Sequence, residues 1–241
     1  MINGEVKQPS EKDILCIRLK ALLEIQMLVF PSNNSYALSF WDKWDQRIRN
    51  AHNEDENEIN EIYKRFENHK NNYPEYDQAF DQSDTLSDDY WETFSLTNSM
   101  YGVLVVAIWS KMESFLKDII LICRDTSEKK DKGSPHIFRK IIKAIKEETK
   151  VQIKLCDSYI IINAIRILNN TFKHNDGIYE PKNCKEIENI DKELLDKWKI
   201  KEKREIEFSE LPIKELITAC YSFSRDLIQK VRTELIKQDR L

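Results

Sequence analysis

The chain has 241 residues, which is enough for one sizeable core, and 33% of them are charged. Hydrophobic residues make up 41%, and only four glycines and six prolines are available for turns, which favours a helical globular protein over an all-β fold. The net charge is −4, so a nucleic-acid partner would have to bind at a local basic patch.

The cysteines and the N-terminal residues indicate a cytoplasmic protein. The five cysteines are scattered with no CxxC pair, which favours reduced thiols over a zinc site or a disulfide framework. The first residues are polar, unlike those of a signal peptide. The longest apolar run, Tyr101 to Trp109, has nine residues and is too short to cross a bilayer. We therefore expect no insertion into a membrane.

Two helical segments are expected in the N-terminal third of the chain. Ser10 fits the N-cap of a helix over residues 11–30, because its hydroxyl can accept a hydrogen bond from a free backbone N–H group. A second helical segment is expected over 36–72. Residues 42–92 carry 15 acidic and six basic side chains, a local net charge of −9. This stretch is either a solvated helix face or an acidic surface that binds a basic partner.

A domain boundary is expected at residues 73–87, which are rich in Asp, Gln and Ser. It separates an N-terminal helical extension, 1–85, from a helical domain, 86–241. That domain begins with the strongest helical pattern of the chain, 86–124, in which apolar residues recur at spacings of three and four. Glu113 lies among these apolar positions, where an unpaired carboxylate would be costly to bury. It is expected either to form a structural ion pair or to take part in a site.

Residues 136–154 are expected to form a helix with a separate basic stripe. The stripe repeats at spacings of three and four and contains Arg139, Lys143, Lys146, Lys150 and Lys154. Such a row is ordinarily a solvated face. It can also follow a phosphate backbone, because neighbouring Lys and Arg side chains add electrostatically.

Residues 160–177 carry the polar pattern on which the functional interpretation depends. Arg166, Asn170 and His174 recur at steps of four, and each step turns only about 40° around a helix. A guanidinium, an amide and an imidazole therefore line one stripe, beside an apolar stripe that can seat the helix on a core. Asn175-Asp176-Gly177 should end the helix, because Asn and Gly tolerate the left-handed conformation. The polar stripe is therefore expected at an exposed helix end.

The C-terminal part is expected to contain one short strand and the last helix. Residues 204–208 alternate polar and apolar side chains, a pattern consistent with a strand in a small β-hairpin. Residues 209–212 then open the last helix, because proline suits a first helical turn. The predicted fold is therefore an all-α bundle with at most one short β-hairpin before the last helix.

The segment LNNTFKHNDG, residues 168–177, resembles the signature of the HEPN superfamily. These are small all-α domains found in RNA-cleaving toxins, abortive-infection proteins and related defence systems. The family signature has an arginine, a polar residue, three further residues and a histidine, so Asn170 and His174 match it. Asn169 stands where the family has arginine. The nearest arginine is Arg166, one turn earlier in the expected helix.

Residues 108–116 also resemble the first core helix of the family, in which an aromatic residue is followed by Glu and an apolar pair. The resemblance covers roughly residues 86–235 and implies a HEPN-like bundle that forms a homodimer with two facing copies of the motif. It implies metal-independent cleavage or binding of RNA in a prokaryotic defence or toxin system, with an antitoxin or another defence protein as a further partner. The alternative is a catalytically inactive module that binds a partner protein or a nucleotide.

The expected roles follow from the chemistry of each side chain. His174 can exchange protons near neutral pH, Arg166 can hold a phosphate by two hydrogen bonds, and Asn170 can orient either group. The residues expected to bind RNA are Lys173, Arg139, Lys143, Lys146 and Lys150. The residues expected to support the site are Glu113, Asn169 and Asp176. The histidines expected on the surface are His52, His69 and His136. No cofactor is expected, and no metal-ligand cluster is apparent in the sequence.

Overall fold

The structure is a computed structural model. It describes residues 10–29, 73–125, 137–181 and 189–241, together with isolated positions between 43 and 64. Its elements are α1 (Glu11–Val29), α3 (Tyr73–Asp125), α4 (Phe138–Thr149), α5 (Tyr159–His174), α6 (Lys192–Lys197) and α7 (Ile213–Lys237), with the short 3-10 helices η1 (Ile153–Leu155) and η2 (Phe208–Glu210). No β-strand occurs among the described residues, so the predicted all-α fold class is confirmed.

Several sequence-based predictions fall on residues that the structure does not describe. They are the continuous helix over 36–72, most of the acidic stretch before residue 73, Cys184, and the histidines His52, His69 and His136. Those predictions stay untested. Among the helices that are described, none is both long enough and apolar enough to span a membrane.

The chain divides into two compact units, and the division differs from the one expected at residue 85. Unit 1 comprises Met1–Asn33, Val105–Ile206 and Pro212–Leu241, and unit 2 comprises Asn34–Leu104 and Glu207–Leu211. The expected N-terminal extension is corrected on this point, because α1 packs against α7 within unit 1. The apolar face of α1 needs a partner, and the last helix of the chain supplies it.

The expected boundary over residues 73–87 is helical. α3 begins at Tyr73, well before the predicted start at Leu86. Pro74 does not prevent this, because the first turn of a helix makes no use of the N–H group that proline lacks. Residues 73–87 are polar and lack apolar residues at helical spacing. The sequence therefore predicted a linker, whereas the chain forms the first turns of a long helix here.

α1 begins with the cap that the sequence predicted. The Ser10 hydroxyl accepts a hydrogen bond from the Asp13 N–H group at 3.2 Å, and Asp13 Oδ2 accepts one from the Ser10 N–H group at 2.9 Å. Two free backbone donors are thereby satisfied reciprocally. The hydrogen bond from the Ser10 side chain lowers the pKa of Asp13. The leucines that α1 then buries are Leu15, Leu19 and Leu22.

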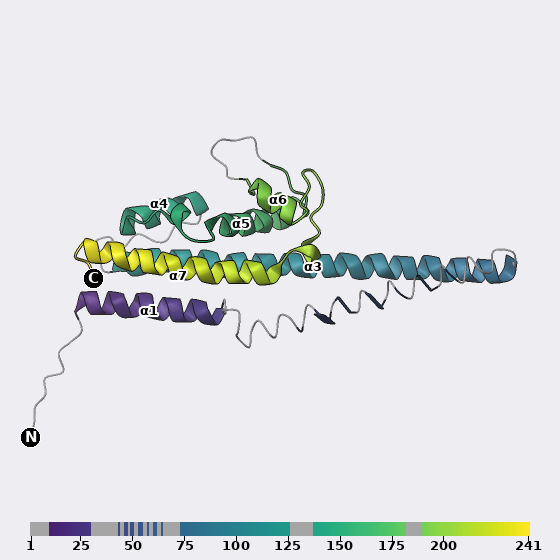
Figure 1. Cartoon of the computed structure of the whole chain (residues 1–241), viewed down its shortest axis with the longest axis horizontal. Helices are drawn as coiled ribbons and strands as arrows, with labels where there is room; N and C mark the ends of the chain where they lie inside the picture. The colour runs from purple at the N-terminus through teal and green to yellow at the C-terminus, as the bar shows by residue number, and fades with distance from the viewer. Residues whose placement is uncertain are drawn as a thin grey trace, which may run out of the picture. The chain divides into compact units, whose positions relative to one another are not determined.

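Unit 1 is assembled around α7. This helix packs against α1, α4 and α5, and Figure 1 shows α4, α5 and α6 along one side of it and α1 along the other. Its apolar residues recur at spacings of three and four, and those that are completely buried are Leu216, Cys220, Phe223, Leu227, Val231 and Leu235. Each large apolar side chain contributes about 1.5–3 kcal/mol when fully buried. This core fixes α5, the helix that carries the HEPN-like segment.

α4 ends at Thr149, so only part of the predicted basic stripe is helical. Lys150 adopts a left-handed backbone conformation with φ 64°, and its N–H group bonds the carbonyl oxygen of Lys146 at 2.9 Å. That conformation ends the helix. The residues of the stripe that lie on the exposed face of α4 are Arg139, Lys143 and Lys146, whereas Lys150 and Lys154 lie beyond its end.

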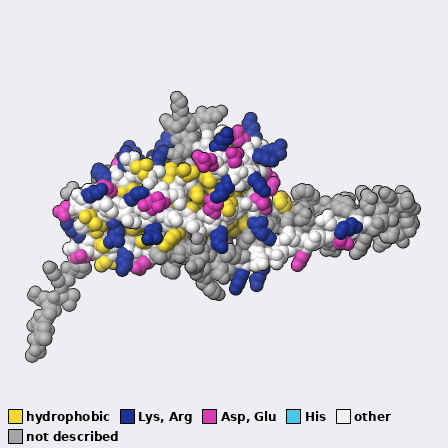
Figure 2. Space-filling model, in the orientation of Figure 1, with side chains coloured by type: hydrophobic (Ala, Val, Ile, Leu, Met, Phe, Trp, Pro, Cys, Tyr) yellow, Lys and Arg dark blue, Asp and Glu magenta, His cyan; other side chains and the backbone are white. Residues whose placement is uncertain are grey.

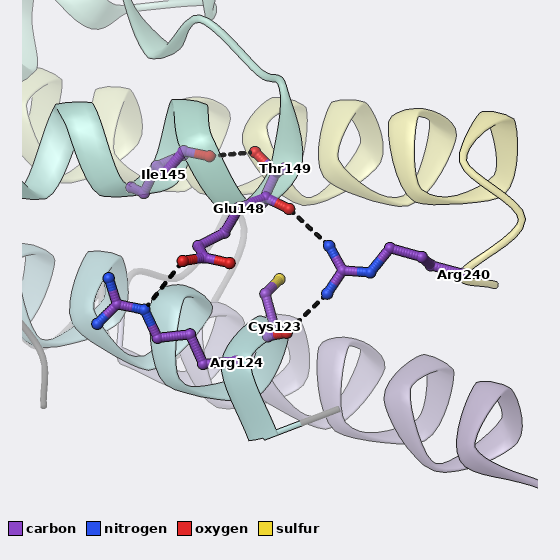
Figure 3. A network of polar contacts seen from close by, with 6 residues as sticks. All are labelled: Cys123, Arg124, Ile145, Glu148, Thr149 and Arg240. Atoms are coloured by element: carbon purple, nitrogen blue, oxygen red, sulfur yellow. Dashed lines mark hydrogen bonds and ion pairs between the residues drawn. The ribbon is translucent and has the colours of Figure 1, made fainter. Parts of the chain in front are cut away.

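A buried polar network joins the ends of three helices of unit 1 (Figure 3). Arg124 at the end of α3 donates a hydrogen bond from Nε to Glu148 Oε1 of α4 at 3.1 Å, and both residues are less than 10% exposed. The guanidinium of Arg240, beyond α7, donates to the backbone carbonyls of Glu148 and Cys123, each at 2.7 Å. These are the last carbonyls of α4 and α3, where a cation is favourable.

The expected β-hairpin is not formed within the described residues. Instead, Ile178 and Glu205 make an isolated antiparallel bridge. Tyr179 donates its N–H group to the Arg204 carbonyl at 3.1 Å, and Lys203 donates its N–H group to the Tyr179 carbonyl at 2.8 Å. Lys203 has a φ of 58°, which turns the chain and ends the pairing. The partner of the alternating segment is thus the chain that leaves α5, and not a neighbour in sequence.

Candidate functional site

The last turn of α5 presents the residues of the HEPN-like motif to solvent. Asn170, Lys173 and His174 are all exposed, and Asp176 is exposed in the turn that follows. The opposite face of α5 is buried, with Ile165 and Leu168 completely inaccessible. Two residues of the expected polar stripe, Asn170 and His174, are therefore in solvent, whereas the third, Arg166, is half-buried.

The turn after α5 has the expected form. The N–H groups of Asn175 and Gly177 both bond the carbonyl oxygen of Thr171, at 3.0 and 3.2 Å. Asp176 and Gly177 have left-handed backbones, with φ values of 47° and 76°. Glycine adopts this conformation without steric cost. The turn closes the helix directly after His174 and leaves its imidazole at an exposed corner.

Asn169, the residue that stands in the arginine position of the family, points into the protein. It is 3% exposed. Its Nδ2 donates to Asn170 Oδ1 at 3.1 Å, while its own Oδ1 has no hydrogen-bond partner among the described residues. A cation at position 169 of a single chain would therefore lie inside the fold and away from His174.

Arg166 is held by neighbours within unit 1. Its Nε and one terminal nitrogen both donate to Asn163 Oδ1, at 3.1 and 2.8 Å. Its guanidinium carbon also lies 5.1 Å from the centre of the Phe138 ring, over its face. A cation–π contact of this kind adds about 0.5–2 kcal/mol, more as it is desolvated. Arg166 is half-buried and two turns from His174, and its side chain contacts residues of α5 and α4.

A chain of contacts continues behind Phe138 to Glu113. The Phe138 ring meets the Trp109 ring edge to face, with centres 5.3 Å apart. Trp109 Nε1 donates to Glu113 Oε2 at 3.1 Å, and Lys117 forms an ion pair with Glu113 Oε1 at 2.5 Å. Glu113 thus has the cationic partner that one of the two sequence-based interpretations required. Its contacts lie on α3, and they support Phe138 and Arg166 without reaching the end of α5.

Restoring the family arginine should damage the fold. We expect Asn169→Arg to lower the free energy of unfolding by about 3 kcal/mol, because it places an unpaired charge at a buried position. The matched control is Asn170→Arg, one residue along on the exposed face, which should change stability by no more than about 0.5 kcal/mol. Chemical denaturation of both variants makes the comparison. An Asn169→Arg protein as stable as the wild type would mean that position 169 can face a site.

A basic loop that sequence reasoning missed lies beside the chain that leaves α5. The bridge between Ile178 and Glu205 ties residues 199–204 to the segment that follows His174. The exposed cations of this loop are Lys199, Lys201, Lys203 and Arg204. In the sequence these residues looked like part of a polar connection. The one available signal was their density, because nothing local indicated that their partner follows α5.

Cysteine and metal chemistry find little support in the described part of the chain. Burial raises the pKa of Cys123 and of Cys156 to about 12, and burial also raises the pKa of Cys220. Thiols with such pKa values stay protonated at neutral pH and are poor nucleophiles. Cys16 is also a free thiol. No group of three His, Cys, Asp or Glu side chains among the described residues is arranged to hold a metal ion.

Comparisons with protein-family models, with curated proteins and with solved structures find no match to this chain. The functional interpretation therefore depends on the residues themselves. These are the exposed motif residues at the end of α5 and the basic surfaces of α4 and of the 199–204 loop.

Proposed function

We propose that this protein binds single-stranded RNA at the exposed end of α5 and cleaves it there without a metal ion, as the HEPN resemblance implies. The observation that carries the proposal is the joint exposure of Asn170, Lys173 and His174 on one helical turn. An imidazole, an ammonium and an amide on one turn can together hold a phosphate and move a proton.

The cleavage is an internal transfer of the phosphate. The ribose 2′-oxygen attacks the neighbouring phosphorus and loses its proton, the bond from phosphorus to the 5′-oxygen breaks, and that oxygen takes up a proton. The products are a 2′,3′-cyclic phosphate and a 5′-hydroxyl, with no change in oxidation state. His174 is the group that exchanges these protons, and cations around the phosphate stabilise the developing charge.

The exposed face of α4 is a second basic surface on which a phosphate backbone can lie. Arg139, Lys143 and Lys146 stand one turn apart on this face, and Lys150 follows directly after the helix. Lys143 Nζ lies 3.8 Å from Glu147 Oε1, a loose contact, and both side chains are more than half exposed. An exposed pair of this kind is weak, so the ammonium remains accessible to a phosphate.

The second candidate is a non-catalytic HEPN-like module that binds a partner protein or a nucleotide. Two observations favour it: Asn169 is buried where the family has arginine, and Arg166 is engaged by Asn163 and Phe138. In this case the end of α5 would be a contact surface. The homodimer, the antitoxin partner and the cytoplasmic location that the sequence led us to expect stay predictions under either candidate.

The wild-type protein should cleave RNA in the presence of EDTA. We expect a fluorescent single-stranded RNA of mixed sequence to yield fragments that end in a 2′,3′-cyclic phosphate, which mass spectrometry identifies. Binding is measured on the same RNA by fluorescence anisotropy, with an RNA duplex as the comparison. Binding without fragments would contradict cleavage and favour the second candidate. Neither binding nor fragments would contradict the proposed function altogether.

A further inference from the structure

We infer that the loop over residues 199–204 is a phosphate-binding element that completes the site at the end of α5. In this arrangement Lys203 and Arg204 hold the RNA phosphate beside His174, in place of the arginine that position 169 lacks. The inference rests on the proposed binding of RNA. It adds the location of further cations beyond Lys173, which α5 itself supplies.

Backbone hydrogen bonds fix this loop against the chain that leaves α5. Going outward from the helix, Gly177 accepts from the Ile206 N–H group at 3.0 Å, and Tyr179 accepts from the Lys203 N–H group at 2.8 Å. The Tyr179 side chain is 1% exposed, and its hydroxyl accepts from the Ile190 N–H group at 3.3 Å. The loop is thus attached to a buried anchor only five residues after His174.

The charge of the loop differs from that of the whole protein. Residues 199–205 carry four basic and two acidic side chains, a net charge of +2 in a chain whose net charge is −4. All four cations are exposed. Figure 2 shows Lys and Arg side chains on the visible face, with Asp and Glu side chains among them. The loop is the local basic patch that an acidic protein needs in order to bind a polyanion.

Two lysines of the loop occupy backbone conformations that favour glycine, which indicates that their side chains have a role in binding. Lys199 and Lys203 both have left-handed backbones, with φ values of 54° and 58°. Glycine or asparagine adopts this conformation at lower cost than lysine does. Strained backbone positions of this kind occur often at binding sites. Two exposed lysines held in this conformation fit a loop that presents cations in fixed directions.

The end of α5 carries little positive charge of its own beside His174. Arg166 donates to Asn163 and stacks on Phe138, and Asn169 is buried, so neither places a positive charge beside His174. Lys173 is the one Lys or Arg side chain on the exposed last turn of α5. A phosphodiester in a cleavage transition state carries more charge than one ammonium can stabilise. The 199–204 loop is a basic segment that the backbone pairing brings to the chain leaving this helix end.

The test is a double variant that keeps the backbone. Lys203→Asn preserves a residue that tolerates the left-handed conformation, and Arg204→Gln preserves length and hydrogen-bonding capacity while removing charge. The matched control removes two exposed cations elsewhere, Lys20→Ala with Lys237→Ala. Each of these lysines forms a surface pair with a glutamate one turn away. The probe is a fluorescent single-stranded RNA, titrated by anisotropy over a series of salt concentrations.

We expect the loop variant to bind RNA about tenfold more weakly at low salt, and its salt dependence to fall by about 1.4 in the slope of log affinity against log salt, for two lost phosphate contacts. The control should bind within about twofold of the wild type, because distant exposed charges are screened. A loop variant that binds like the control, while Lys173→Ala weakens binding, would overturn the inference and leave the proposed function standing. Wild type that binds no RNA at low salt would overturn both.

Discussion

Glu148→Ala is expected to lower the free energy of unfolding by about 3–5 kcal/mol, the largest effect on stability among the changes considered. The Glu148 side chain is 5% exposed, and its carboxylate accepts a hydrogen bond from Arg124, whose side chain is 10% exposed. Removing the carboxylate takes a negative charge and a hydrogen-bond acceptor away from a buried guanidinium. Water cannot replace that partner readily, because both side chains are buried. Denaturant unfolding followed by circular dichroism measures the loss.

Two further variants identify the cause of that loss. Glu147→Ala removes the neighbouring exposed carboxylate, whose side chain is 54% accessible, and should change stability by no more than about 0.5 kcal/mol. The double variant Arg124→Met with Glu148→Met should recover most of the loss, because two apolar side chains of similar size leave no charge buried. A double variant no more stable than Glu148→Ala would show that packing or the Arg240 contacts, and not the unpaired charge, set the cost.

The parts of the fold that the sequence predicted well depend on local interactions. Ser10 caps α1 through residues three positions away, and the turn at Asp176 and Gly177 closes α5 through bonds to Thr171. The apolar period of α7 directly reports the face that it buries. In each case the physical cause lies within one or two helical turns, so a single sequence contains it.

The parts that were missed depend on residues far apart in the chain. α1 packs on α7, although the sequence placed it in a separate extension. The segment around Glu205 pairs with Ile178, whereas its alternating pattern had predicted a hairpin with a neighbouring segment. The start of α3 was missed for another reason, because a polar helix carries no apolar period. No local propensity identifies such partners.

In the candidate site, too, the local features were predictable from the sequence and the tertiary contacts were not. Helical spacing predicted the exposure of Asn170 and His174. The same spacing could have predicted the burial of Asn169, because it follows the buried Ile165 by four residues. The engagement of Arg166 could not be foreseen, since Phe138 belongs to another helix. Spacing on one helix therefore placed the imidazole correctly, but the positions of the cations around it are a tertiary property.

His174→Ala is expected to reduce the rate of RNA cleavage by about 10²–10⁴-fold, the largest effect on activity among the changes considered. The imidazole is exposed at the last turn of α5, and it is the group in the motif that can exchange protons near neutral pH. RNA binding should change by less than about threefold, because the lysines and not the histidine provide most of the attraction to phosphate. Single-turnover cleavage measured beside anisotropy separates the two quantities.

Stability and a matched control decide whether the loss comes from chemistry. An exposed side chain at a helix end contributes little to the core, so His174→Ala should unfold within about 0.5 kcal/mol of the wild type. Lys237→Ala removes an exposed cation from the last turn of α7 and should cleave like the wild type. A His174→Ala protein that cleaves normally would show that the histidine takes no part in the cleavage and would contradict its proposed role. A wild type that leaves the RNA uncut, together with a His174→Ala protein that melts several degrees lower, would assign the histidine to the fold. The end of α5 would then be a contact surface, and the second candidate function would take the place of the first.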